Sequence, residues 1–480
     1  MFETSVIWIR VACATKTLLL FVCFCQLCPA PRLLLNCPSP VRHIRGLLRV
    51  NRTRSLPILS STFSEFLPAA FTRSSSGSPA GLRRLNVARV FETVRLNGPL
   101  TRQSIGEISG LSKPTVNEAL EILNNEKLIS LNEAKTKSTT GRPGPKAQQI
   151  TFNKDRKKIV AIDIGGSNIR LLVSDLDGNI IATLMQSTPL KNGRKAILAK
   201  VKELYDTALT ENKIKVSDIG SIVAGSPGTI DPATGEITRS YNLPDWENFS
   251  LSDELSKVLK KQVNVENEAH LAIYGEHWRG GAKDLANAAA MSVGVGIGLG
   301  LLINGQVYRG FNGIAGEVGN LPLQIADEAK SPVNANFEFH ASAVGLERNF
   351  EAVKNKEGAK EIIKLAGTSP VSAKTIYAAA AKGNKLATEL VNQQLELLSR
   401  GIASVCCITN PEVFILEGGL APALEPHLKT ISKMVQKITL IAPKIVISEL
   451  KDLATAYGAL RRGIENVDRA TLISILQETA

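Results

Sequence analysis

The sequence predicts an α/β protein with a helix-turn-helix ahead of its main body. Two observations lead to this prediction. Three short amphipathic helical segments follow one another between residues 81 and 123, and after residue 158 apolar strands that end in glycine turns alternate with helical stretches. A chain of 480 residues is also too long for one hydrophobic core and indicates roughly two to four domains.

The composition is that of a globular protein, with 44% apolar and 21% charged residues. The chain has no Gly-X-Y period, sustained heptad or apolar run of about 20 residues, which argues against collagen, a coiled coil and a polytopic membrane protein. Residues 1–158 carry 24 Lys and Arg against 9 Asp and Glu, whereas the remaining residues carry 33 against 35. The basic N-terminal part therefore predicts a polyanionic partner, either nucleic acid or an anionic membrane surface.

Residues 1–78 are predicted to be an unstructured extension or the product of an upstream translation start. Residues 17–25 (TLLLFVCFC) imitate a secretory signal but are too short to span a bilayer, and a genuine signal or anchor is the alternative. Five of the seven cysteines lie in the first 37 residues, and the other two are the adjacent Cys406 and Cys407. The body therefore has neither a disulfide framework nor the spaced thiols of a structural zinc site, and we expect a cytoplasmic protein without a membrane partner.

Residues 79–152 are predicted to form the DNA-binding domain. Thr101 and Ser112 are expected N-caps of the second and third helices, and Gly110 ends the second. The first helix has its apolar stripe at Val87, Val90, Phe91 and Val94. A basic stretch at residues 135–146 can be a wing or a solvated linker, and Arg142 within it would suit a narrow minor groove.

The third helix is the predicted recognition helix, because its N-terminal end carries polar residues that face away from the apolar stripe. Lys113 and Asn117 can donate hydrogen bonds to bases, and Ser112 and Thr115 to phosphates. The predicted DNA-binding residues are Ser112, Lys113, Pro114, Thr115, Asn117 and Arg142. The alternative is a charged face on a purely structural helical domain.

Three glycine turns in the body could hold a nucleotide. Glycine lets backbone N–H groups approach phosphate oxygens, and Asp163 in the first turn could hold Mg²⁺ through water. The predicted nucleotide-binding residues are Asp163, Gly165, Gly166, Ser167, Asn168, Gly294, Gly296, Gly418 and Gly419. The alternative is three tight turns without a ligand.

A group of amide and carboxylate side chains suits the binding of sugar hydroxyls. Its members are Asn267, Glu268, Glu317, Asn320 and Glu338. One carboxylate could also deprotonate a hydroxyl that attacks ATP. Taken separately, each is an ordinary loop residue. The histidines lack metal-ligand spacing, and no metal site is predicted.

These residues together resemble the ROK family, named for its repressors, open reading frames and kinases. The resemblance covers roughly residues 82–462 and rests on the motifs LSKPTVNEAL, GRP, DIGGSNIR, GSPGTID, NLPDW, VENEA, GIAGEVGN and NPEVFILEGGL. It implies a winged helix-turn-helix joined to a two-lobed actin-like (ribonuclease H-like) ATPase fold at residues 153–480. It also implies a sugar bound between the lobes and a homodimer or dimer of dimers.

Five departures from the family's kinases argue against efficient phosphorylation. Asn267-Glu268 stands where the kinases have an Asn-Asp pair whose Asp is the general base. Val295 replaces a threonine, Asn320 a histidine that binds zinc and sugar, and Glu417 a glycine on the adenosine side. The cysteine-rich zinc motif is missing. The positions that match the family's sugar contacts are Gly228, Asn267, Glu317 and Glu338.

The sequence therefore predicts a sugar-responsive transcriptional regulator, by resemblance a repressor, with a degenerate kinase-like sensor. Its expected partners are operator DNA and a sugar or sugar derivative. No cofactor is required in this interpretation, structural zinc is expected to be absent, and ATP with Mg²⁺ remains an alternative ligand. The alternative function is an ATP-dependent sugar kinase with a DNA-binding head, in which Glu268 is the catalytic base.

Overall fold

The computed structural model describes residues 6–13, 16–23, 33–34, 78–133, 148–231, 234–240, 243–322 and 336–477. The chain divides into two units, residues 1–56 and 57–480, and each is described by itself. In the first unit, β1 (Val6–Cys13), β2 (Lys16–Cys23) and β3 (Leu33–Leu34) form an antiparallel sheet. These strands lie where we expected an unstructured extension. Their many Val, Ile, Leu and Phe residues have high strand propensity, which accounts for the difference.

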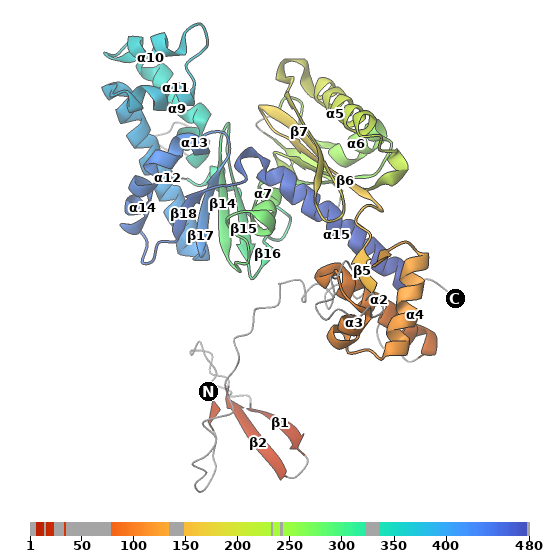
Figure 1. The fold of residues 1–480 in the computed structure, drawn as a ribbon. Helices are drawn as coiled ribbons and strands as arrows, with labels where there is room; N and C mark the ends of the chain where they lie inside the picture. The colour runs from red at the N-terminus through yellow and green to blue at the C-terminus, as the bar shows by residue number, and fades with distance from the viewer. Residues whose placement is uncertain are drawn as a thin grey trace, which may run out of the picture. The chain divides into compact units, whose positions relative to one another are not determined.

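The second unit begins with three helices and a two-stranded sheet (Figure 1), which we call the head, residues 78–152. Its elements are α2 (Pro79–Asn97), α3 (Arg102–Ser109), α4 (Lys113–Asn125), β4 (Ile129–Glu133) and β5 (Gln148–Phe152). The side chains of Thr101 and Ser112 cap α3 and α4, and Gly110 ends α3 with a φ of 68°, which confirms the predicted boundaries. The predicted stripe of the first helix is buried in the core of the head.

The first lobe of the body is a five-stranded sheet with the order β13-β9-β6-β7-β8. Its strands are β6 (Lys158–Ile164), β7 (Asn168–Ser174), β8 (Ile180–Ser187), β9 (Ile219–Ser226) and β13 (Val263–Asn267). Both faces of β6 are covered: Val160 and Ile162 pack against the core with α5 (Gly193–Glu211) and α6 (Leu251–Leu259), and Ile159 and Ala161 against α15 (Ala454–Gln477). This explains why Ile159 to Ile162 are all apolar instead of alternating with polar residues.

The second lobe repeats this topology with the order β16-β15-β14-β17-β18. Its strands are β14 (Ala288–Val293), β15 (Ile297–Ile303), β16 (Gln306–Val307), β17 (Val413–Glu417) and β18 (Lys444–Ile447). In each lobe three consecutive antiparallel strands are extended by two parallel strands. This repeat is the two-lobed arrangement that the resemblance implied.

Short elements and the remaining helices complete the body. The first lobe adds β10 (Thr229–Ile230), β11 (Glu236–Arg239) and β12 (Phe249–Ser250). The second adds α8 (Phe337–Ala341), α9 (Ala343–Val353), α10 (Ala359–Ala366), α11 (Ala373–Ala381), α12 (Lys385–Thr409), α13 (Ala421–Leu424) and α14 (Leu428–Gln436). None of the helices in the described ranges is long and apolar enough to cross a membrane.

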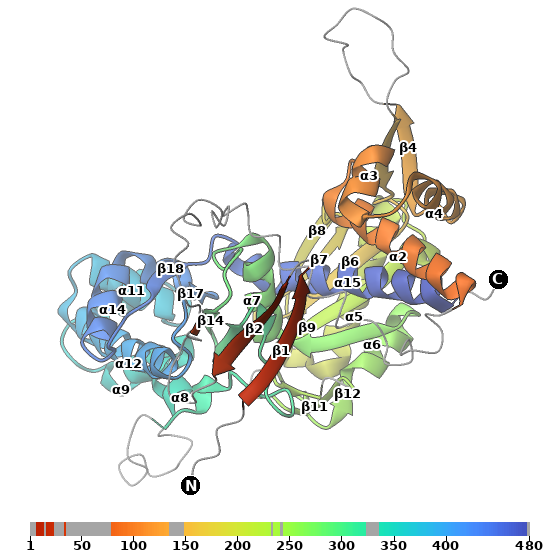
Figure 2. The same ribbon diagram turned by 90° about the horizontal axis from the view of Figure 1, so that it is seen from below.

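Two helices join the lobes and the head. α7 (Glu268–Arg279) follows the first sheet and places Ile273 against Ala288 and Ala290 of the second. α15 packs along α7 and the first sheet, and it ends with Ile475 and Leu476 in the core of the head. Figures 1 and 2 show this helix running from between the lobes to the head. Its 24 residues make it about 36 Å long.

Glycines let α7 and α15 approach closely. A Cβ at Gly458 of α15 would lie 1.8 Å from the carbonyl oxygen of Leu271, and one at Gly275 of α7 would lie 2.1 Å from that of Ala454. Both clashes are with backbone atoms, so neither can be relieved by a rotamer change. The two helices can therefore lie at this distance only with glycine at both positions.

We predict that Gly458→Ala lowers the free energy of unfolding by about 2 kcal/mol or more, because the added methyl group has to push the two helix backbones apart. Urea unfolding followed by circular dichroism measures this change. Gly106→Ala in α3 is the matched control, since its Cβ would meet only ordinary contacts at 3.4 Å and 4.0 Å. Equal stability of the Gly458 variant and the wild type would contradict the close-packing argument.

Candidate ligand-binding site

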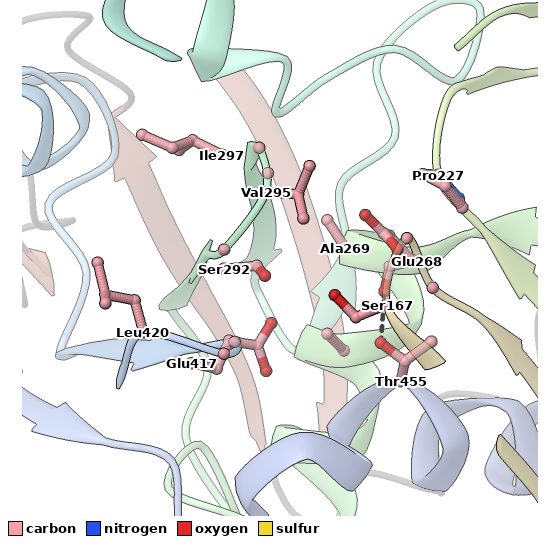
Figure 3. Close-up of a pocket in the computed structure, with 18 of the residues that line it drawn as sticks. Ser167, Pro227, Glu268, Ala269, Ser292, Val295, Ile297, Glu417, Leu420 and Thr455 are labelled. Atoms are coloured by element: carbon pink, nitrogen blue, oxygen red, sulfur yellow. Dashed lines mark hydrogen bonds between the residues drawn. The ribbon is translucent and has the colours of Figure 1, made fainter. Parts of the chain in front are cut away.

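A cavity of about 510 Å³ lies between the two lobes. Its wall includes fourteen of the fifteen residues predicted from the sequence for sugar or nucleotide. Figure 3 places Glu417 and Ser292 on one side of the cavity and Ser167, Glu268 and Thr455 on the other. Turns from both sheets and the start of α15 thus meet at one site.

Asn320 is the predicted residue that does not line the cavity. The adjacent Gly319 is buried, and a Cβ on it would lie 3.0 Å from the carbonyl oxygen of Ile297 and 3.2 Å from Cβ of Glu338. Because the backbone of Gly319 fills this space, the side chain of Asn320 is left exposed at the end of a short 3-10 helix, Val318–Asn320. The structure therefore gives no support to Asn320 as a sugar contact.

The first glycine turn brings Asp163 opposite Arg170, because β6 and β7 pair in that register. Nη1 of Arg170 donates to Oδ2 of Asp163 at 3.1 Å, and its Nη2 donates to Oδ2 of Asp452 at 2.6 Å. Burial raises the pKa of Asp163 to about 6, and the positive charge of Arg170 opposes that rise. Arg170 thus links the first sheet to the segment that precedes α15.

Asn267 and Glu268 lie where β13 ends and α7 begins. The amide oxygen of Asn267 accepts from the backbone N–H groups of Ala269 and His270, and its Nδ2 donates to the carbonyl oxygen of Gly228 at 3.0 Å. Asn267 therefore caps α7 and fixes the turn at Gly228, whose φ of 109° favours glycine. Much of its hydrogen-bonding capacity is already in use.

Glu268 is the first residue of α7 and has no hydrogen-bond partner for its carboxyl among the residues that the structure describes. Its backbone oxygen accepts from Oγ1 of Thr455 at 3.3 Å, the dashed line in Figure 3. Burial first, and then the charges of Asp163, Glu317 and Glu338, raise the pKa of Glu268 to about 8. Its carboxyl is thus largely protonated at neutral pH.

The second lobe contributes Glu317, Glu338 and Glu417. Oε2 of Glu338 accepts from the backbone N–H of Ile297 at 2.7 Å, and partial burial raises the pKa of both Glu338 and Glu317. Glu417 ends β17, and only 4% of its surface is exposed. Burial, followed by the charges of Glu276, Glu268 and Asp163, raises the pKa of Glu417 well above its usual range.

The cavity wall is strongly acidic. Seven carboxyl groups line it, on Asp163, Glu268, Glu317, Glu338, Glu347, Glu417 and Asp452, against three basic groups, on Arg170, Lys374 and Lys451.

Some lining residues were not predicted from the sequence. They are Arg170, Glu347, Lys374, Lys451, Asp452 and Thr455. Hairpin register could have placed Arg170 beside Asp163, but Asp452 and Thr455 come from the far end of the chain and carry no local signal. In the described part of the chain, no group of three or more His, Cys, Asp or Glu residues is arranged to hold a metal ion.

The exposed end of α4 carries the predicted DNA-binding residues. Ser112, Lys113, Pro114 and Asn117 are exposed, and Thr115 is half-buried. Oδ1 of Asn117 accepts from Nη1 of Arg102 at 3.0 Å, so an arginine of α3 joins this face. Arg142 lies outside the described residues.

Comparison with known proteins places this fold and cavity in a family. Residues 159–461 match the ROK family. A glucokinase of Thermotoga maritima is 30% identical over 277 residues, which cover 56% of this chain and 84% of the glucokinase. A xylose repressor of Caldicellulosiruptor bescii is 26% identical over 399 residues, which cover 82% of this chain and 98% of the repressor. The solved structure of a ROK family transcriptional regulator, a homolog of E. coli MLC protein, has a TM-score of 0.65 at 21% identity and covers 83% of this chain and 100% of that one.

The repeated sheet topology and the cavity between the lobes define an α/β protein with the actin-like, kinase-type fold. The match over residues 159–461 spans more than half of the chain, and the protein belongs to the ROK family. The resemblance seen in the sequence motifs is thereby confirmed.

We predict that the free energy of unfolding falls as the pH rises from about 5 to 8. The pKa of Glu268 is raised from 4.5 to about 8, so the folded state binds more protons than the unfolded state in this window. The contribution of Glu268 to the free energy of unfolding is fully present below its pKa in the unfolded state. It is lost as the pH rises through its pKa in the folded state, and the free energy of unfolding then falls by up to about 1.4 kcal/mol per pH unit. Urea unfolding across this range should show a shallower slope for Glu268→Gln. Glu389→Gln, at an exposed position of α12, is the control, and equal slopes for all three proteins would contradict the prediction.

Proposed function

We propose that the protein is a sugar-responsive transcriptional regulator, acting as a repressor. One observation carries this proposal: α15 begins in the wall of the cavity and ends in the core of the head, so one rigid element contacts both the ligand site and the domain with the exposed polar helix. The similarity to the xylose repressor supports it, because that match extends over 82% of the chain and is not confined to the kinase-like body.

The head is proposed to be a winged helix-turn-helix that binds operator DNA. α4 would enter the major groove with its N-terminal end, where Lys113 and Asn117 are exposed. The β4–β5 pair would be the wing, and Arg142 between these strands remains a candidate for a minor-groove contact. We propose a homodimer or dimer of dimers, because two half-sites one helical turn apart require two recognition helices.

The cavity is proposed to bind a sugar through Gly228, Asn267, Glu268, Glu317 and Glu338. Protonated Glu268 can donate a hydrogen bond, and ionised carboxylates can accept from hydroxyl groups, so the wall offers both roles that a sugar hydroxyl needs. Because these residues belong to both lobes, a ligand that contacts all of them favours the closed arrangement of the lobes.

Coupling to DNA is proposed to run through Arg95 of α2. Its Nε donates to Oδ2 of Asp468 on α15 at 3.0 Å, and its Nη2 donates to the carbonyl oxygen of Leu176 in the first lobe at 2.7 Å. The guanidinium also lies over the ring of Phe152, 4.4 Å from its centroid. This partly buried arginine thus adds polar contacts from the head to both α15 and the first lobe, beside the apolar contacts of Ile475 and Leu476.

A sugar kinase with a DNA-binding head is the second candidate. The similarity to a glucokinase favours it, as does the position of Glu268 beside Asp163 and the glycine turns. Two features weigh against it. Arg170 is occupied by Asp163 and Asp452, and the longer side chain of Glu268 moves the carboxylate from where an aspartate would hold it. Sugar-dependent release of ADP from ATP and Mg²⁺ would support this candidate.

We predict that Lys113→Ala combined with Asn117→Ala removes sequence preference while leaving general DNA affinity largely intact. Base contacts of this kind discriminate by about 1–3 kcal/mol each, which is about tenfold or more in affinity. Selection from a random duplex pool with the wild type, followed by fluorescence anisotropy on selected and scrambled duplexes, measures the ratio. Lys385→Ala, at the start of α12, is the control. Equal weakening on both duplexes would assign these residues to the backbone instead.

We predict that Arg95→Ala reduces the effect of sugar on operator affinity by at least about fivefold, because the head loses its ion pair with Asp468 of α15 and its hydrogen bond to the first lobe, while the apolar contacts of Ile475 and Leu476 remain. The measurement is anisotropy of the selected duplex with and without D-xylose or D-glucose. Arg89→Ala, an exposed change on the same helix, is the control. An unchanged sugar effect in Arg95→Ala would contradict coupling through this contact, and no sugar effect in the wild type with any sugar tried would contradict the proposed function.

A further inference from the structure

Glu417 is a largely buried residue of the cavity wall whose carboxyl has no hydrogen-bond partner among the described residues. Only 4% of the residue is exposed, and among the described residues none donates a hydrogen bond to its side chain. Figure 3 shows the carboxyl pointing into the cavity beside Ser292, its neighbour in the β14–β17 register. A buried carboxyl without hydrogen bonds is costly, so its retention here calls for a role in the cavity.

Glu417 lies beside glycine turns of the kind that can bind a phosphate group. It is followed by Gly418 and Gly419, and Gly294 follows the neighbouring strand β14, with the backbone nitrogen of Gly419 3.8 Å from where a Cβ of Gly294 would lie. Adjacent glycine turns of this kind leave backbone N–H groups accessible to an anion. The Glu417 side chain occupies the same end of the cavity as these turns.

This end of the cavity is lined by acidic groups, which a phosphate would have to approach. After burial, the carboxyls of Glu276, Glu268 and Asp163 raise the pKa of Glu417, so all three act on it. Of the three basic groups in the wall, Arg170 is held by Asp163 and Asp452, and Lys374 and Lys451 are exposed at the edge. No lining cation is therefore both buried and unpaired.

We propose that Glu417 closes the glycine-turn end of the cavity to nucleotide phosphates and so makes the cavity selective for uncharged sugars. This inference rests on the proposed function for the identity of the sugar site, and it assigns the specificity to one side chain. Ionised, Glu417 repels a phosphate. Protonated, it still fills the space beneath the turns, and a phosphate beside it opposes its ionisation.

The test is binding of ADP and of D-glucose or D-xylose to the wild type and to two variants of the full chain. Glu417→Gln removes the charge and keeps the size, and Glu417→Ala removes both. Both variants replace an unpartnered buried carboxyl with a neutral side chain, so the melting temperature should be unchanged or higher. Isothermal titration calorimetry gives the dissociation constants, and the melting temperature gives an independent signal.

The expected result is that the wild type binds a sugar but not ADP, and that the ADP dissociation constant falls by at least about tenfold in Glu417→Ala and to a smaller degree in Glu417→Gln. Glu412→Gln is the matched control, because Glu412 immediately precedes β17 but lies outside the cavity wall, where it accepts from the backbone N–H groups of Ala286 and Asn287 at 3.0 Å. This variant should behave as the wild type does.

Two results would overturn the inference: ADP binding to the wild type as tight as to Glu417→Ala, or no gain of ADP binding in either folded variant. If the protein binds a sugar but neither variant binds ADP more tightly than the wild type, Glu417 does not exclude phosphates, and the proposed sugar sensor is unaffected. A gain for ADP without binding of any sugar would support the role of Glu417 and count against the sugar sensor.

Discussion

The close packing of α7 against α15 is the constraint on which the rest of the body depends. Gly275 and Gly458 allow the two backbones to lie nearly in contact, and Glu268 and Thr455, near the N-terminal ends of these helices, both line the cavity. α7 also covers one face of the second sheet, and α15 covers one face of the first. We expect a change in the angle between the lobes to shift α15, and with it the residues that enter the core of the head.

The cavity combines glycine turns with an unusually acidic wall. These turns are the ones that the sequence predicts for a nucleotide, whereas the carboxyls of Asp163, Glu268 and Glu417 share a space in which they cannot all be ionised at neutral pH. Such a wall suits hydroxyl groups better than phosphates. The charge distribution thus agrees with a body that senses a sugar and transmits the binding event, rather than one organised around phosphoryl transfer.

Local patterns in the sequence predicted most of the elements and most of the cavity. The caps at Thr101 and Ser112 and the end of the second helix at Gly110 each have a signal within a few residues, and the structure confirms them. Asp452 and Thr455 could not be predicted, because they reach Asp163 and Glu268 only after the two lobes and α15 are assembled. The exposure of the Asn320 side chain could not be predicted from the sequence either, because it depends on the backbone of Gly319 filling the space beside Ile297 and Glu338. The strands of residues 6–34 were missed because the signal-like composition of that segment hid their strand propensity.

The central claim is that a sugar between the lobes alters the attachment of the head through α15. Hydrogen exchange of the full chain, followed by mass spectrometry with and without D-xylose or D-glucose at saturating concentration, tests it most directly. The account predicts altered protection along α15 up to residue 477 and in α2, in addition to the turns of the cavity. Altered protection confined to the cavity turns, with α2 and the second half of α15 unchanged while sugar is bound, would contradict it.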